Sequence, residues 1–149
     1  MTKMEAEFLR TRTYWTVTAF GDVLGSSYTN DSYSVAQLTK PGTLPTEASA
    51  RRVNRAFKKW MDDRFPGREM PNGGQYFMAF ADGAIKVGKA WKSESEATRK
   101  KYGNCWKDQG DAHRAAEALA WLCAKERELF ELRHNDRAEG EQERLPGAS

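Results

Sequence analysis

The chain has few of the residues that build disulfides or metal sites: two cysteines and two histidines among 149 residues. Two cysteines are too few for a disulfide framework, so we interpret both as reduced thiols of a cytoplasmic protein. The amino-terminal segment lacks the apolar core of a secretory signal, and no apolar run approaches the roughly 18–20 residues of a membrane-spanning helix. The sequence therefore predicts a cytoplasmic protein with no membrane partner.

The cysteines and histidines match the ligand count of a structural zinc site but not its spacing. Their order is Cys105, His113, Cys123 and His134, a pattern unlike that of zinc fingers or ribbons. His113 and Cys123 are expected on one helix, about 15 Å apart at 1.5 Å per residue. Zinc holds its ligands at about 2.0–2.3 Å, so these side chains cannot converge on one ion. We predict no metal and no other cofactor.

Motifs of catalysis are also missing from the sequence. It contains no glycine-rich phosphate loop, no His-Glu-x-x-His pair and no serine nucleophile elbow. Asp62 and Asp63, and likewise Glu94 and Glu96, are expected at exposed helix ends, whereas an acid–base pair would need mutual burial. We therefore predict that the protein is not an enzyme.

The chain does contain enough apolar residues for a folded domain. It is 39% hydrophobic and 11% aromatic, which suits one globular domain of this length. We place that domain at residues 1–134 and a polar C-terminal tail at 135–149. The predicted fold class is α+β, with an antiparallel sheet of about three to five strands covered by two long helices and a short one.

Several segments carry the periodicity of strands and helices. Residues 12–20 alternate and are rich in aromatic and β-branched residues, so they predict a strand that turns into a second one at Val23. Residues 32–38 are a further strand candidate. A long helix should begin at Thr46, with one apolar face. That face would hold Val53, Phe57, Trp60 and Met61.

Asp82-Gly83 between two alternating runs predicts a β-hairpin with a two-residue turn. In that register Phe80 pairs with Ile85, and Gly88 lies opposite Phe77. After a charged insert, Asp111 is expected to cap a last helix that runs from Ala112 to about Arg133. Its apolar stripe would include Ala115, Ala118, Leu119, Trp121, Leu122, Leu129 and Leu132.

Gly103-Asn104-Cys105-Trp106, followed by Asp111-Ala112 at the helix start, carries a resemblance. The region from 75 to 132 resembles a recurring C-terminal segment in small phage and mobile-element proteins, where Gly-Asn-x-Phe precedes a Glu-Glu-Ala-Glu helix. This chain departs from it with Trp106 and a longer spacer. That family has no assigned chemistry, so the resemblance implies a mobile-element origin and no catalytic site. By size and charge the chain could then be an anti-CRISPR-type inhibitor.

Charge is unevenly distributed along the chain. Residues 51–107 hold 14 basic and 6 acidic side chains, whereas residues 108–149 hold 6 and 10. This asymmetry predicts an oriented binding surface, although such faces are often merely solvated and ion-paired. The candidate partner-binding residues are Arg51, Arg52, Arg55, Lys58, Lys59, Lys86, Lys89 and Lys92.

Two functions stay open. The first is a non-enzymatic, stoichiometric binding protein that inhibits or modulates a host protein or ribonucleoprotein complex, for example a CRISPR effector. The second is a nucleic-acid-binding module, in which the basic helix face contacts phosphates and Phe77 or Trp91 stacks on bases. The acidic last helix favours the first, because it would repel a nucleic acid.

Overall fold

A computed structural model describes residues 1–69, 71, 75–88 and 101–140, with side chains up to residue 133. The fold is α+β, as predicted, but the strands form two separate antiparallel pairs instead of one larger sheet. Its elements are α1 (Lys3–Thr11), β1 (Thr13–Val17), β2 (Val23–Ser27), α2 (Ser32–Ala36), η1 (Gln37–Thr39), α3 (Glu47–Arg64), β3 (Tyr76–Ala79), β4 (Ile85–Gly88) and α5 (Gln109–Gly140).

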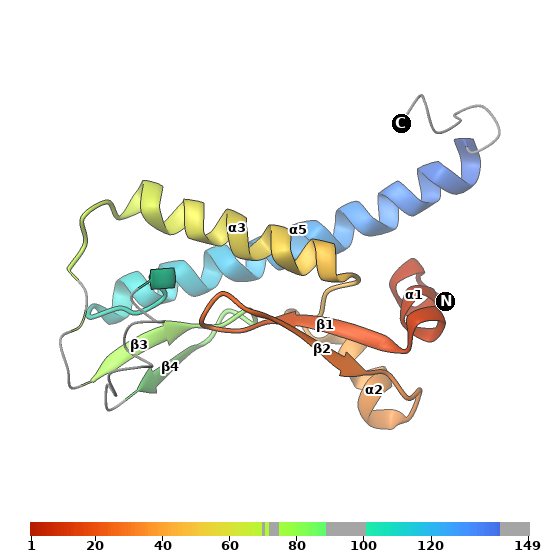
Figure 1. The fold of residues 1–149 in the computed structure, drawn as a ribbon, viewed down its shortest axis with the longest axis horizontal. Helices are drawn as coiled ribbons and strands as arrows, with labels where there is room; N and C mark the ends of the chain where they lie inside the picture. Colours follow the sequence, from red (N-terminus) through yellow and green to blue (C-terminus); the bar gives the residue numbers. More distant parts are fainter. Residues whose placement is uncertain (70, 72–74, 89–100, 141–149) are drawn as a thin grey trace.

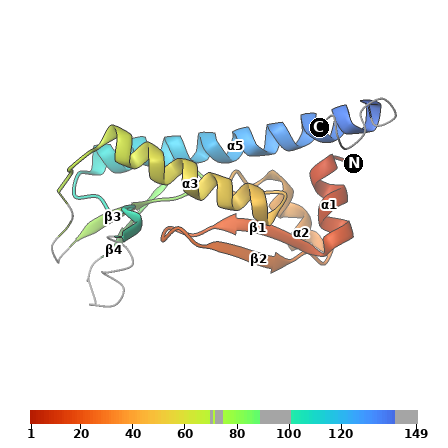
Figure 2. The ribbon, with the colours of Figure 1, turned by 45° about the horizontal axis from the view of Figure 1, so that its top comes forward.

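The helices α3 and α5 lie side by side (Figures 1 and 2). The two hairpins lie one after the other along the same face of this helix pair. A loop residue pairs with one edge of each hairpin. Leu44 exchanges two backbone hydrogen bonds with Trp15 of β1, and Trp106 exchanges two with Phe77 of β3. These bridges extend the hairpins at β1 and at β3, and the described strands stay two separate pairs instead of one sheet of three to five.

The start of α3 is determined by residues next to it in sequence. Thr46 Oγ1 accepts a hydrogen bond from the Ser49 N–H at 3.0 Å, and Ser49 Oγ accepts one from the Thr46 N–H at 3.1 Å. This reciprocal cap satisfies two donors that the first turn would otherwise leave unpaired. The predicted helix start is therefore confirmed.

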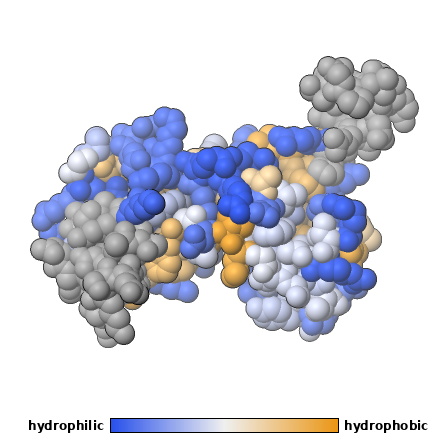
Figure 3. Space-filling model, viewed as in Figure 1, coloured by the Kyte–Doolittle hydropathy of each residue, from blue (hydrophilic) through white to orange (hydrophobic). Residues whose placement is uncertain are grey.

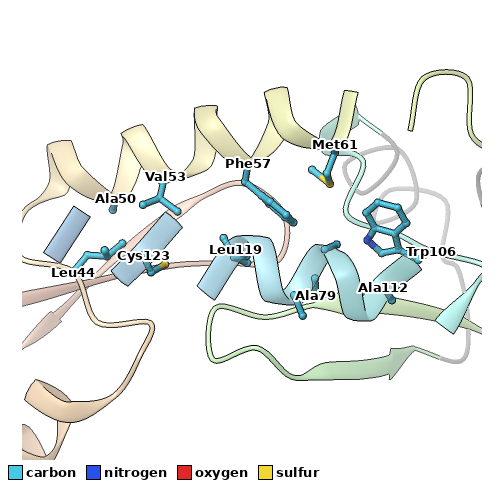
Figure 4. Close-up of a cluster of buried hydrophobic side chains, with 12 residues drawn as sticks. Leu44, Ala50, Val53, Phe57, Met61, Ala79, Trp106, Ala112, Leu119 and Cys123 are labelled. Carbon is cyan, nitrogen blue, oxygen red and sulfur yellow. The ribbon is translucent and has the colours of Figure 1, made fainter. Parts of the chain in front are cut away.

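The core lies between α3, α5 and the hairpins. Figure 4 shows Val53, Phe57 and Met61 of α3 pointing toward α5, where Leu119 and Cys123 meet them. The predicted apolar face of α3 is confirmed for these residues, and burial of such side chains contributes about 1.5–3 kcal/mol each. Trp60, also expected on this face, is only partly buried.

The β3–β4 hairpin has a register one residue away from the predicted one. Phe77 pairs with Val87 and Tyr76 with Gly88. The turn holds three residues instead of two, because the Phe80 N–H bonds to the Ala84 carbonyl and Gly83 adopts φ +86°. A type I turn closed by a left-handed glycine is the common three-residue hairpin. The shift turns Phe77 and Ala79 toward the core and leaves Phe80 half-buried.

The segment at 32–38 is helical, so its prediction as a strand is wrong. Asp31 caps the helix, since its Oδ1 accepts a hydrogen bond from the Ser34 N–H at 2.8 Å. Asp and Ser favour such local bonds to the backbone over strand pairing. The helix α1 was not predicted at all.

The last helix is longer than predicted and starts earlier. Asp108, not Asp111, provides the cap, because its Oδ1 accepts a hydrogen bond from the Asp111 N–H at 2.8 Å. The helix continues past Arg133 to Gly140, into the region we assigned to the tail. Within the described ranges no helix is long and apolar enough to cross a membrane.

Asn104 joins three parts of the fold from a buried position. Its amide group donates to the carbonyls of Ala79 (2.9 Å) and Ala19 (3.2 Å). Its Oδ1 accepts from the Ala79 N–H and from Trp106 Nε1, each at 3.0 Å. The Gly-Asn-x-aromatic segment is therefore a structural junction in this chain, with Trp106 buried beside it.

Candidate binding surface on α3

The predicted basic residues of α3 lie on its outer surface, with one exception. Arg51, Arg55 and Lys59 are exposed, and Lys58 is half-buried. Arg52 instead points along the side of α3 that meets α5. Figure 3 shows the surface of α3 as predominantly hydrophilic. We call Arg51, Arg55, Lys58 and Lys59, with the acidic side chains that pair with them, the α3 surface.

Most of the cations on α3 are paired with carboxylates. Three pairs connect successive turns of the same helix, which is the spacing at which such side chains meet. The fourth connects α3 to α5 and is less exposed than the others. The pairs are Arg51–Glu47, Arg52–Glu126, Lys58–Asp62 and Lys59–Asp63, with nitrogen–oxygen distances of 2.5, 2.8, 3.3 and 2.7 Å.

Arg55 differs from its neighbours, because no ion pair joins it to the part of the chain that the structure describes. It lies at an open groove whose other charged side chains are Lys58, Lys59, Asp62 and Asp63. The hydrogen bond to Asp63 raises the pKa of Lys59, so this lysine stays charged. The groove thus holds three cations and two carboxylates side by side, and Arg55 is the cation among them without an ion pair to the described residues.

Hydrogen bonds join the inner wall of this groove to neighbouring segments. Asn54 donates two hydrogen bonds to the carbonyls of Gly21 and Asp22, and the Tyr102 hydroxyl donates to the Asn54 carbonyl at 3.2 Å. Burial raises the pKa of Tyr102 above its usual range, so its hydroxyl stays protonated. These contacts position α3 against the β1–β2 turn.

Lys86 does not join the α3 surface. It lies on β4, where its Nζ is 4.4 Å from the centre of the Phe80 ring. The hairpin packs against α5, and Figure 1 places α3 and β4 at opposite edges of the molecule. Lys89, Lys92 and Trp91 lie outside the described residues. The structure therefore groups the α3 cations and separates Lys86 from them.

The cysteines do not provide a reactive group. Cys123 is buried in the core, and burial raises the pKa of its thiol to about 12. Cys105 is also buried, although its place in a loop before α5 would allow partial exposure. Thiolate, not thiol, is the nucleophile and the metal ligand. Among the described side chains, no three His, Cys, Asp or Glu residues converge as metal ligands would.

Two features of the surface were missed from the sequence. The first is the acidic partner of Arg52, which lies 74 residues away on α5. The second is the exposure of Trp121 and Leu132, which we expected in the core.

Comparison with protein-family models, with curated proteins and with solved structures found no match to this chain.

Proposed function

We propose that the protein is a non-enzymatic binding protein that inhibits or modulates a host complex by occupying one of its surfaces. A phage or mobile-element origin, and a ribonucleoprotein such as a CRISPR effector as target, are parts of this proposal that come from the sequence resemblance. The observation that carries the binding function is the pairing of cations with carboxylates on α3.

This pairing favours a protein partner over a nucleic acid. The six cations of α3, Arg52 and Arg64 included, share the helix and its border with four carboxylates, so the ten groups carry only two net positive charges. Phosphates would meet Glu47, Asp62 and Asp63 along with the cations, and each phosphate contact would compete with an existing ion pair. A protein surface of mixed charge can instead complement both signs, which contributes specificity and association rate.

A nucleic-acid-binding module is the second candidate, favoured by the net charge of +8 over residues 51–107. In that case affinity should fall linearly with salt on logarithmic axes, with a slope set by the number of phosphates contacted.

The experiment compares the wild-type chain with two triple variants of equal charge change. The test variant carries Arg51→Glu, Arg55→Glu and Lys59→Glu on the α3 surface. The control carries Arg10→Glu, Lys107→Glu and Arg114→Glu, at exposed cations that each form one ion pair. Both should retain the wild-type melting temperature to within a few degrees, because exposed pairs contribute about 0–1 kcal/mol each.

Binding is then measured for short single-stranded and duplex DNA and RNA, and for complexes captured from host cells. We expect weak nucleic-acid binding and one host complex that the control variant still captures and the test variant does not. Tight, salt-dependent nucleic-acid binding would support the second candidate. If both variants capture the complex equally well, the α3 surface faces solvent and does not contact the partner.

A further inference from the structure

The helix α5 carries a second apolar stripe on the side that faces away from the core. Trp121 and Leu132 are 62% and 50% exposed, which is unusual for such large apolar side chains. They are three helical turns apart, so they project from the same side. Between them stand Lys125 and Glu128, both exposed, and neither forms an ion pair with any described part of the chain.

The other sides of α5 are occupied within the molecule. Its inner face packs on the core through Ala115, Leu119 and Cys123. One flank is tied to α1 and to the loop after η1: Glu131 accepts hydrogen bonds from two α1 backbone N–H groups, and Arg127 donates to three backbone carbonyls. Figure 2 shows α5 along the outer edge of the fold, with α3 and the hairpins on its other sides.

The stripe is complementary to itself when two copies of α5 run antiparallel. The midpoint between Trp121 and Leu132 is also the midpoint between Lys125 and Glu128. A two-fold axis through that midpoint therefore places each Trp121 beside Leu132 of the second copy. The same axis places each Lys125 level with Glu128 of the second copy.

We propose that this stripe is a dimer interface, and that its occupant is a second copy of this chain in an antiparallel α5–α5 arrangement. A two-fold interface needs a surface that complements itself, and one axis here satisfies both the apolar and the charged pairs. Each tryptophan can bury on the order of 100 Å². The contact is therefore small compared with the roughly 1,200–2,000 Å² of a stable interface, so we expect dissociation in the micromolar range.

This inference does not depend on the proposed function, because the residues of α3 that border Trp121 are Trp60 and Arg64, which are not part of the α3 surface. It also distinguishes a second copy from a foreign partner. In a symmetric pair, exchanging the two charges restores the attraction between copies. Against a foreign surface the exchanged charges would stay mismatched.

The test is sedimentation velocity of the full chain from about 1 to 200 μM, with melting curves to verify folding. We expect the wild type to shift from monomer to dimer over this range, and Trp121→Glu to stay monomeric. Lys125→Glu and Glu128→Lys alone should each weaken dimerisation at least tenfold. The double variant should return to within about threefold of wild type. Lys58→Glu, on α3, is the control and should dimerise as the wild type does.

Three results would overturn the proposal. A wild-type chain that stays monomeric at 200 μM has no such interface. A dimer that Trp121→Glu leaves intact uses another surface. If both single reversals weaken association and the double variant does not recover, the two charges do not face one another across a two-fold axis, and the antiparallel α5–α5 arrangement is wrong.

Discussion

Replacing Asn104 by alanine should remove the junction between the hairpins and the loop before α5. The wild-type side chain makes four hydrogen bonds, to the Ala79 N–H, the Ala79 carbonyl, the Ala19 carbonyl and Trp106 Nε1. All four partners would lose their bond in a site where Asn104 itself is only 1% exposed. At about 1 kcal/mol for each lost bond, the cost is about 4 kcal/mol or more. A domain of this size has about 5–15 kcal/mol in total.

The free energy of unfolding can be measured by urea denaturation at 25 °C, followed by tryptophan fluorescence and circular dichroism. With a slope of about 2 kcal/mol/M, the midpoint should fall by about 2 M while the slope stays constant. His113→Ala, at an exposed position of α5, is the control and should change the stability by less than about 0.5 kcal/mol. A loss below about 1 kcal/mol for Asn104→Ala would refute the reasoning.

Asn104→Asp gives an independent check, because aspartate retains the acceptor oxygen and loses the amide donor. Its carboxylate would face the carbonyls of Ala79 and Ala19, so its folded-state pKa should rise above the unfolded value of about 3.9. A raised pKa gives stability that is present below the unfolded value and is lost as pH rises through the folded value. Relative to wild type, this variant should therefore be more stable at pH 4 than at pH 7.

Two further predictions concern the interior. Gly21→Ala should be clearly less stable than Gly67→Ala: both residues have positive φ, but only at Gly21 would the new Cβ meet a ring, 2.5 Å from Tyr102 Cδ1. Equal melting temperatures would contradict the packing described for that ring. Neither Cys105 nor Cys123 should react with a thiol reagent until the chain is unfolded. Because burial raises the pKa of Cys123 from 9.0 to about 12, stability should fall between those pH values, by up to about 1.4 kcal/mol per pH unit, and Cys123→Ala should fall less steeply.

Local signals allowed correct prediction of the elements whose ends depend on near neighbours. The start of α3 was predictable because its capping residues are three positions apart. Val53, Phe57 and Met61 were predictable as core residues, because their spacing repeats with the helical turn and that side of α3 meets the rest of the fold. The outer position of most α3 cations follows from the same periodicity.

Predictions failed where two local patterns compete or where the partner is distant in sequence. Asp82-Gly83 is compatible with both a two-residue and a three-residue turn, and a change of one residue reverses which side chains face the core. On α5 the apolar positions outnumber what one side can bury. Packing against α3 selected Leu119 and Cys123, and left Trp121 outside.

The sequence by itself determined the fold class, the position of the long helix α3, the places at which the two hairpins turn and the cations available on α3. Only the tertiary structure decided which of those cations are neutralised, as when Arg52 meets Glu126 on α5. It also decided that Asn104 joins β3 to the turn between β1 and β2. The physical reason is range: caps, turns and helical periodicity act over three or four residues, whereas ion pairs and buried amides are formed by segments that only the folded chain brings together.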